Sequence, residues 1–177
     1  MKIAVLGGGR VGAALADRWR DAGHEVAVST RDTVADTARG ADVVVLAVPA
    51  AAAADVLGQA GDLEGAVLVD ATNNLSGGPD AAEIARLAGG APVVKAFNTV
   101  FAQFFAAPPE RPASLVIAGA DTDAKETAAR LVRDAGFDPI DAGGDDAVPL
   151  VEAFARLVIG IAYRQGRGPF VYRFDGP

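Results

Sequence analysis

Short apolar runs alternate along the chain with segments in which apolar residues recur at helical spacing. The runs predict strands at residues 2–6, 25–30, 42–48, 66–71, 92–97, 114–118 and 137–141. The periodic segments predict helices at residues 10–22, 50–60, 79–88, 122–135 and 146–164. Regular alternation of strand and helix is typical of a parallel sheet with helices on both faces. We therefore expect an α/β fold with a doubly wound, mostly parallel sheet.

A glycine-rich turn joins the first predicted strand directly to the first predicted helix. Gly7 permits the tight turn, Gly9 lets the backbone approach a pyrophosphate, and Gly12 brings the helix close to the sheet. The amides at the start of the helix then point at the anion. This context predicts a Rossmann-type dinucleotide site, and the alternative is a glycine-rich turn without a ligand.

The end of the second predicted strand bears on which dinucleotide is bound. NAD-selective Rossmann folds place an acidic residue there, which bonds the ribose hydroxyls. This chain has Ser29 and Thr30 followed by Arg31, and two hydroxyls with a guanidinium suit a 2′-phosphate. The prediction is NADP(H), with the alternative that Arg31 is solvated or pairs with Asp32.

The connection from Arg31 to the next strand is short. The usual unit places a helix, a third strand and a second crossover here, but residues 31–41 barely suffice for one crossover. We expect the outer helix and the usual third strand to be absent, so that strand 25–30 lies at the sheet edge.

Size and composition exclude several classes of protein. The 177 residues predict one domain, residues 1–177. The chain has no cysteine and one histidine, so we expect no metal site. A net charge of −7 argues against nucleic acid as a partner. No apolar run is long enough to cross a bilayer, and Met1 leads straight into a strand, so we expect no membrane association and a cytoplasmic protein.

Amide and hydroxyl side chains predominate where the predicted strands end. Thr72–Asn74 and Asn98–Thr99 follow two of them, without a Ser/His/Asp set or a carboxylate pair. Hydride transfer fits such a site because the cofactor does the chemistry while the protein holds two rings together. We therefore assign positioning residues and no catalytic residue. Lys95 has two interpretations, ligand contact or a structural role.

Several stretches resemble the NADPH-dependent F-420 reductase family and the related cytosolic domains of metalloreductases. They are KIAVLGGGRVG, GHEVAVSTRD, ADVVVLAVP, VDATN, VVKAFNTV and AGFDPIDAG. The resemblance implies a Rossmann dimer that passes hydride between NADP(H) and a deazaflavin, coenzyme F-420. The residues assigned to the cofactor are Gly7, Gly9, Arg10, Val11, Gly12, Ser29, Thr30, Arg31, Val48, Pro49, Asn73 and Ala96, and those assigned to the substrate are Phe97, Asn98 and Thr99. Asp145 and Asp146 depart from the pattern, because they would repel an acidic deazaflavin tail.

The C-terminal segment 146–177 predicts a homodimer. Helix 146–164 is apolar on nearly every side, and residues 170–174 alternate like a short edge strand. The function predicted is an oxidoreductase that uses NADP(H) and F-420 or a similar planar acceptor, whose identity the sequence does not fix. The alternative is a non-catalytic NADP(H)-binding module or sensor subunit.

Overall fold

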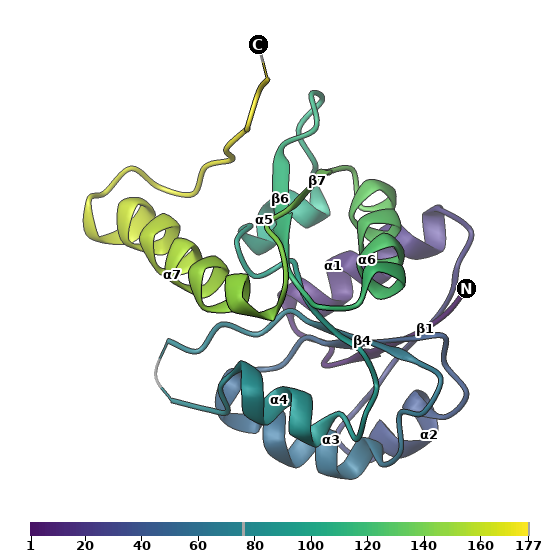
Figure 1. Cartoon of the computed structure of the whole chain (residues 1–177). Coiled ribbons are helices and arrows are strands. Elements are labelled where there is room, and N and C mark those ends of the chain that lie inside the picture. Colours follow the sequence, from purple (N-terminus) through teal and green to yellow (C-terminus); the bar gives the residue numbers. More distant parts are fainter. Residues whose placement is uncertain (76, 177) are drawn as a thin grey trace.

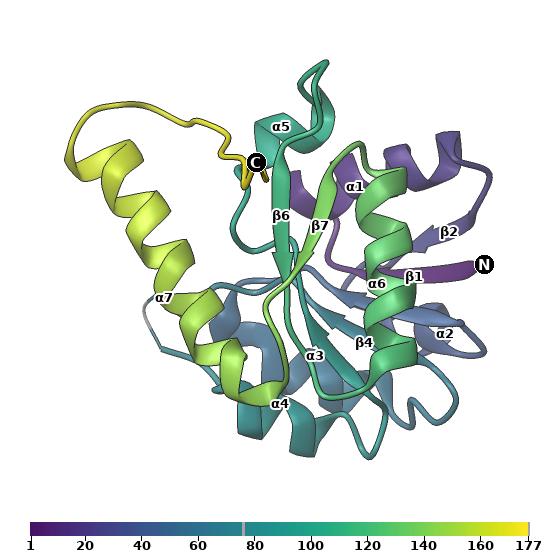
Figure 2. The same ribbon diagram turned by 45° about the horizontal axis from the view of Figure 1, so that its top comes forward.

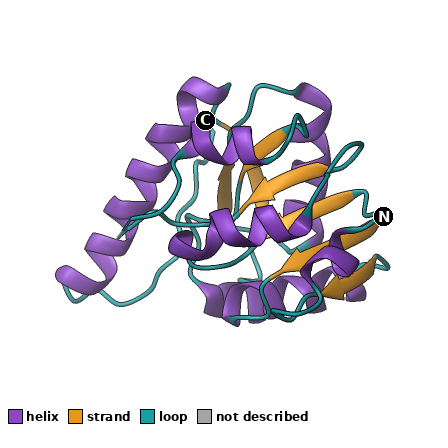
Figure 3. Cartoon of the chain, turned by 90° about the horizontal axis from the view of Figure 1, so that it is seen from below, coloured by secondary structure: helices purple, strands orange, loops and turns teal. Residues whose placement is uncertain are grey.

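A parallel sheet of five strands forms the centre of the computed structural model, which describes residues 1–75 and 77–176 (Figures 1 and 3). Its strands lie in the order β2-β1-β3-β4-β5. They are β1 (Lys2–Leu6), β2 (Glu25–Val28), β3 (Val43–Leu46), β4 (Val67–Asp70) and β5 (Val93–Lys95). Val5 of β1 pairs with Val28 on one side and Val45 on the other. The order reverses between β1 and β3, and ligands of such sheets bind beyond the carboxyl ends at that point.

Helices cover both faces of this sheet (Figure 1). One face carries α1 (Arg10–Asp21), α5 (Ala102–Ala106) and α6 (Thr122–Asp134). The other carries α2 (Val34–Ala38), α3 (Ala53–Ala60) and α4 (Ala81–Leu87), and a 3-10 turn at Ala50–Ala52 precedes α3. Successive strand side chains alternate between the two core clusters, so the strands are apolar at nearly every position except their ends, where Lys2, Glu25, Asp70 and Lys95 lie. The predicted α/β Rossmann-type fold is confirmed.

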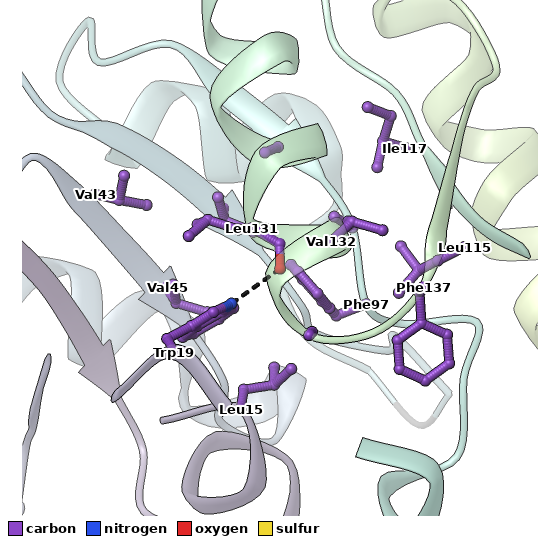
Figure 4. Packing of buried hydrophobic residues seen from close by; sticks show 14 of the residues in the cluster. Leu15, Trp19, Val43, Val45, Phe97, Leu115, Ile117, Leu131, Val132 and Phe137 are labelled. Atoms are coloured by element: carbon purple, nitrogen blue, oxygen red, sulfur yellow. Dashed lines mark hydrogen bonds between the residues drawn. The ribbon is translucent and has the colours of Figure 1, made fainter. Parts of the chain in front are cut away.

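The larger core cluster includes the buried Trp19 of α1 (Figure 4). Its indole N–H donates to the Leu131 carbonyl oxygen at 2.9 Å, which ties α1 to α6. The Phe97 ring lies edge-on to Trp19 with 5.6 Å between centroids, and Phe105 lies 5.9 Å further along. These aromatic contacts hold the chain just after β5 in place.

A second sheet of two parallel strands, β6 (Ser114–Ile117) and β7 (Asp138–Asp141), stands beside the first. One antiparallel bridge joins the sheets, where the Lys95 N–H donates to the Ala118 carbonyl at 2.8 Å and the reverse bond is 3.1 Å. The seven predicted strands are therefore present, divided between two sheets.

The segment after Arg31 largely matches the expectation. No strand lies between residues 32 and 41, and β2 is at the sheet edge. The expected absence of a helix is wrong, because α2 spans Val34–Ala38 and packs Val34 and Ala38 into the core. This five-residue helix is the whole crossover to β3, as the length of the gap allows.

The C-terminal part differs from the sequence expectation in two ways, in the division of the predicted helix and in the absence of a strand at residues 170–174. The predicted helix 146–164 consists of a 3-10 turn at Asp145–Ala147, α7 (Val148–Ile159) and a π-helical turn at Gly160–Arg164. As expected for a helix with apolar residues on too many faces for one domain to cover, one face of α7 is buried while Leu150 and Leu157 on the other are 70% and 57% exposed. Residues 170–174 form no strand, although the Ser114 N–H donates to the Tyr172 carbonyl at 2.9 Å. Pro177, the end of the predicted domain and tail, lies outside the described residues.

In Figure 2, α7 runs along the side of the molecule, separate from the helices that cover the sheet, and the tail turns back toward β6. Within the described part of the chain, no helix is both long and apolar enough to cross a membrane. The helix α5 was not predicted from the sequence.

Candidate functional site

The glycine turn is as tight as the motif requires. A Cβ atom on Gly12 would lie 2.0 Å from the Gly7 carbonyl oxygen, and one on Gly7 would lie 2.5 Å from the Ala47 carbonyl oxygen. Gly7 has a φ of +115°, which L side chains rarely adopt. Gly9 is different, because a Cβ there would meet no atom within 4 Å. The loop thus closes tightly on the protein side and stays open at Gly9, which caps α1.

The end of β2 lies against this turn, since a Cβ on Gly8 would touch the Val28 side chain at 3.4 Å. Beyond it the Thr30 N–H donates to the Thr33 Oγ1 atom at 2.9 Å, and the two hydroxyl groups lie 3.0 Å apart. Arg31 is exposed and makes no ion pair, with Asp32 or any other residue that the structure describes. Its positive charge is therefore available to a phosphate. Thr33 was not predicted as a site residue from the sequence. Its position three residues after Thr30 is the signal that could have indicated it.

Two adjoining hollows lie at the carboxyl ends of the strands. The glycine-loop cleft, of about 290 Å³, is lined by Gly9, Arg10, Val11, Val48, Pro49 and Asn73 among others. The α7 hollow, of about 600 Å³, lies between α1, the segment after β5 and the C-terminal half of α7. Its lining includes Asn73, Asn98, Thr99, Phe101, Val158 and Tyr163. Arg10, Val11 and Asn73 line both, so a ligand in the cleft would extend toward a second ligand in the hollow.

The turn after β5 holds an unusual backbone conformation. Phe97 has a φ of +65°, the one positive value outside glycine among the described residues. Such a conformation costs about 1–3 kcal/mol and persists where the surroundings fix it. The Phe97 ring is buried between Trp19 and Phe105, and Asn98 and Thr99 line the α7 hollow.

Seven of the predicted site residues line neither hollow. They are Gly7 and Gly12 inside the glycine turn, Ser29, Thr30 and Arg31 after β2, and Ala96 and Phe97 after β5. Ala96 is fully buried and Phe97 is 1% exposed in the core, so neither side chain faces the two hollows. The positive φ at Phe97 is the physical reason, because it turns the ring into the core. These side chains support the Asn98–Thr99 turn from the core, and the assignment of Ala96 to the cofactor and of Phe97 to the substrate stays a prediction.

Asn73 and Asn98 fix each other across the junction of the hollows. The Asn73 Nδ2 group donates to the Asn98 carbonyl at 2.9 Å, and the Asn98 Nδ2 group donates to Asn73 Oδ1 at 3.4 Å. These bonds leave Asn98 Oδ1 buried without a donor among the described residues. An unpaired buried acceptor is uncommon and calls for a partner such as a ligand N–H.

Thr99 is held from the C-terminal tail. Its hydroxyl lies 2.6 Å from the Tyr172 hydroxyl. Burial raises the pKa of Tyr172 to about 12, against the lowering effect of the hydrogen bond with Thr99. The phenol therefore stays protonated at neutral pH and can donate to Thr99.

Lys95 lies away from both hollows. Its ammonium group contacts Asp70 and Glu152 and faces a third hollow of about 420 Å³ beside α4. Of its two interpretations, the structure favours the structural one.

Asp145 lines that third hollow too, and Asp146 adjoins it in the turn before α7, whereas the α7 hollow uses the other end of the helix. The predicted repulsion of an acidic ligand tail therefore does not arise at the α7 hollow.

His24 and the acidic groups give no sign of metal chemistry. His24 Nε2 bonds Asp134 Oδ2 at 2.8 Å, on the far side of α1 from the glycine turn, in keeping with a structural role. No group of three or more His, Cys, Asp or Glu side chains within residues 1–75 and 77–176 is arranged to hold a metal ion.

Comparison with known proteins decides the family. The sequence profile described as NADP oxidoreductase, coenzyme F420-dependent, matches residues 2–35 and 28–74. The crystal structure of a proposed F420-dependent NADP reductase from Arthrobacter sp. FB24 is 30% identical over 99% of this chain and 100% of that one, with a TM-score of 0.87. The chain belongs to the coenzyme F420-dependent NADP oxidoreductase family. It is thus a member of an NADP-binding oxidoreductase family with a Rossmann-like fold.

Other solved structures are also similar in fold to this chain. A hypothetical protein from Sinorhizobium meliloti is 29% identical, over 84% of this chain and 88% of that one, with a TM-score of 0.68. A reductive aminase from Aspergillus terreus, in complex with NADPH and ethyl levulinate, is 17% identical over 93% of this chain and 62% of that one, with a TM-score of 0.70. At that identity the likeness shows the fold alone. No curated protein matches the sequence.

Proposed function

We propose that this protein transfers hydride between NADP(H) and a deazaflavin, coenzyme F-420, or a similar planar acceptor. The observation that carries the proposal is the junction of the glycine-loop cleft with the larger α7 hollow at Asn73. Two ligands placed in these hollows would meet at Asn73, as a hydride donor and its acceptor must.

The residues present fit the cofactor. The open space at Gly9 leaves room for a pyrophosphate beside the amides of α1, whose first turn has no acidic residue. Thr30, Thr33 and the exposed Arg31 offer hydroxyl groups and a guanidinium to a 2′-phosphate. Val48 and Pro49 form the wall opposite the glycine loop, where the ribose would lie. When bound, NADPH supplies the hydride.

The α7 hollow fits a planar second ligand. Phe101 and Tyr163 pack edge to face with 5.7 Å between centroids at one side of it, and Val158 adds an apolar surface. Asn98 and Thr99 add amide and hydroxyl groups to the lining. An apolar wall with a few polar groups excludes water from the reacting atoms and orients the ring.

The direct test is to mix NADPH anaerobically with oxidised F-420, a flavin or other planar acceptors and to follow the loss of NADPH absorbance. We expect turnover with a deazaflavin, and much weaker turnover when NADH replaces NADPH. The second candidate is a non-catalytic NADP(H)-binding module. The five-residue α2, which leaves the adenine side with little cover, favours it. NADPH binding without reduction of any acceptor would support this second candidate. A cytoplasmic location, where NADPH is available, is part of the proposal.

A further inference from the structure

Three largely buried charged side chains meet beside the third hollow, outside the groups used so far. Lys95 Nζ is 2.9 Å from Asp70 Oδ2 and 3.0 Å from Glu152 Oε1. The Lys95 and Asp70 side chains are 1% and 4% exposed, and Glu152 is 16% exposed. Burying such charges is costly unless they are paired, and a hydrophobic set of similar size would be at least as stable. Stability alone therefore does not account for the cluster.

The cluster connects the segments that line the α7 hollow. Asp70 is three residues before Asn73, Lys95 three before Asn98, and Glu152 three before Ala155. All three of the later residues line the hollow. The second carboxylate oxygen of Asp70 also accepts the Thr72 N–H at 2.9 Å, which fixes the start of the segment that carries Asn73.

The helix α7 has few other ties to the five-stranded sheet. Its buried Val148 and Val151 pack on Val116 and Ala118, which belong to the second sheet and its bridge. Its Phe154 ring packs on Tyr172 of the tail, with 4.9 Å between centroids. Among the described residues, Glu152 is the α7 side chain that hydrogen-bonds to the five-stranded sheet. Figures 1 and 2 show the helix lying beside the body of the molecule rather than on the sheet.

We propose that Asp70, Lys95 and Glu152 are positioning residues that set the α7 wall against Asn73 and Asn98. The inference rests on the proposed function, because it gives the α7 hollow to the hydride acceptor. Charge pairing makes the arrangement specific, since Lys95 satisfies both carboxylates together in one placement of α7. None of the three residues lines the α7 hollow or the glycine-loop cleft, so they act through the segments they hold.

The test uses Glu152→Gln, which keeps the size of the side chain and removes its charge. The matched control is Glu126→Gln, the same change at an exposed residue of α6 that forms no ion pair with any described residue. Hydrogen exchange of the full chain is followed by mass spectrometry without any ligand. In Glu152→Gln we expect exchange to quicken by about tenfold or more in residues 153–163 and also in 71–75 and 98–103. Residues 2–6 should be unchanged, and the control should match the native protein throughout.

Steady-state kinetics measure an effect on the acceptor KM that a merely structural role would not produce. We expect the acceptor KM of Glu152→Gln to rise by about tenfold, with the Kd of NADPH unchanged and kcat reduced less than threefold. Faster exchange confined to α7, or no change, would overturn the inference. Hydrogen exchange is measured without turnover, so the two claims can fail separately. A native protein that reduces no acceptor would refute the proposed function, and the exchange result would still decide whether the three residues position α7. Lys95→Met leaves two unpaired buried carboxylates, and if that variant fails to fold, Glu152→Gln still decides.

Discussion

The same added methyl group should have different effects at two glycines of one loop, lowering stability at Gly12 and NADPH affinity at Gly9. In Gly12→Ala the new Cβ would lie 2.0 Å from the Gly7 carbonyl oxygen and 3.0 Å from a Val5 methyl group. A backbone oxygen cannot rotate away, so α1 must move off the loop. In Gly9→Ala the new Cβ meets no atom within 4 Å, and φ is −71°, which any residue adopts.

The expected sizes follow from these contacts. We take the upper end of overpacking costs for Gly12→Ala, about 3 kcal/mol, less about 1 kcal/mol that alanine gains within a helix. The remaining ~2 kcal/mol should lower Tm by about 4–8 °C for a chain of this size. Gly9→Ala should lose at most about 1 kcal/mol through weaker capping of α1. Its methyl group enters the glycine-loop cleft, so we expect about tenfold or more weaker NADPH binding.

The assay pairs thermal unfolding with a titration of NADPH fluorescence on the native protein and both variants. Gly9→Ala should keep a near-native Tm and bind NADPH more weakly, whereas the main effect of Gly12→Ala should be a lower Tm. Unchanged NADPH affinity in a folded Gly9→Ala variant would refute the placement of the pyrophosphate at this loop.

Three further predictions concern other parts of the site. Arg31→Ala should weaken NADPH about tenfold or more and leave NADH nearly unchanged, and native protein that binds both cofactors equally in calorimetry would contradict this. Because the pKa of Tyr172 is about 12 in the folded chain and about 10 when unfolded, the phenol contributes stability below pH 10 that is lost as pH rises toward 12. Denaturant unfolding should show this loss, Tyr172→Phe should remove it, and an identical pH dependence in both proteins would argue against it. We propose a homodimer that packs through the exposed Leu150 and Leu157 of α7, so light scattering should give a dimer mass that Leu157→Glu halves. A monomer mass for the native protein would rule the dimer out.

Continuous apolar runs predicted the central strands β1, β3 and β4 correctly, because strands buried on both faces are apolar without alternating polar positions. The length of the gap after Arg31 predicted the missing third strand, since chain length limits a crossover whatever its sequence. The same gap still held α2, because a five-residue helix fits within a single crossover. The glycine spacing predicted the tight turn because Gly7 and Gly12 have no room for a side chain.

The omissions arise where contacts between distant residues decide the outcome. The positive φ of Phe97 turns its ring toward Trp19 and Phe105, and no periodicity predicts that conformation for a non-glycine residue. The partner of Lys95, Glu152, lies 57 residues away, so its ion pair had no signal in the sequence. The helix α5 was missed because the five residues of Ala102–Ala106 are too few to show a period.

Direct transfer of hydride between two adjoining ligands is the central claim, and an isotope measurement tests it most directly. NADPH with deuterium at both C4 positions of the nicotinamide ring is mixed with oxidised F-420 and the protein in ordinary water. The mass of the reduced deazaflavin is then measured by mass spectrometry. We predict one deuterium in the product, carried on the ring carbon that receives the hydride. A reduced product without deuterium, or NADPH that binds and is never oxidised by F-420, would contradict the account.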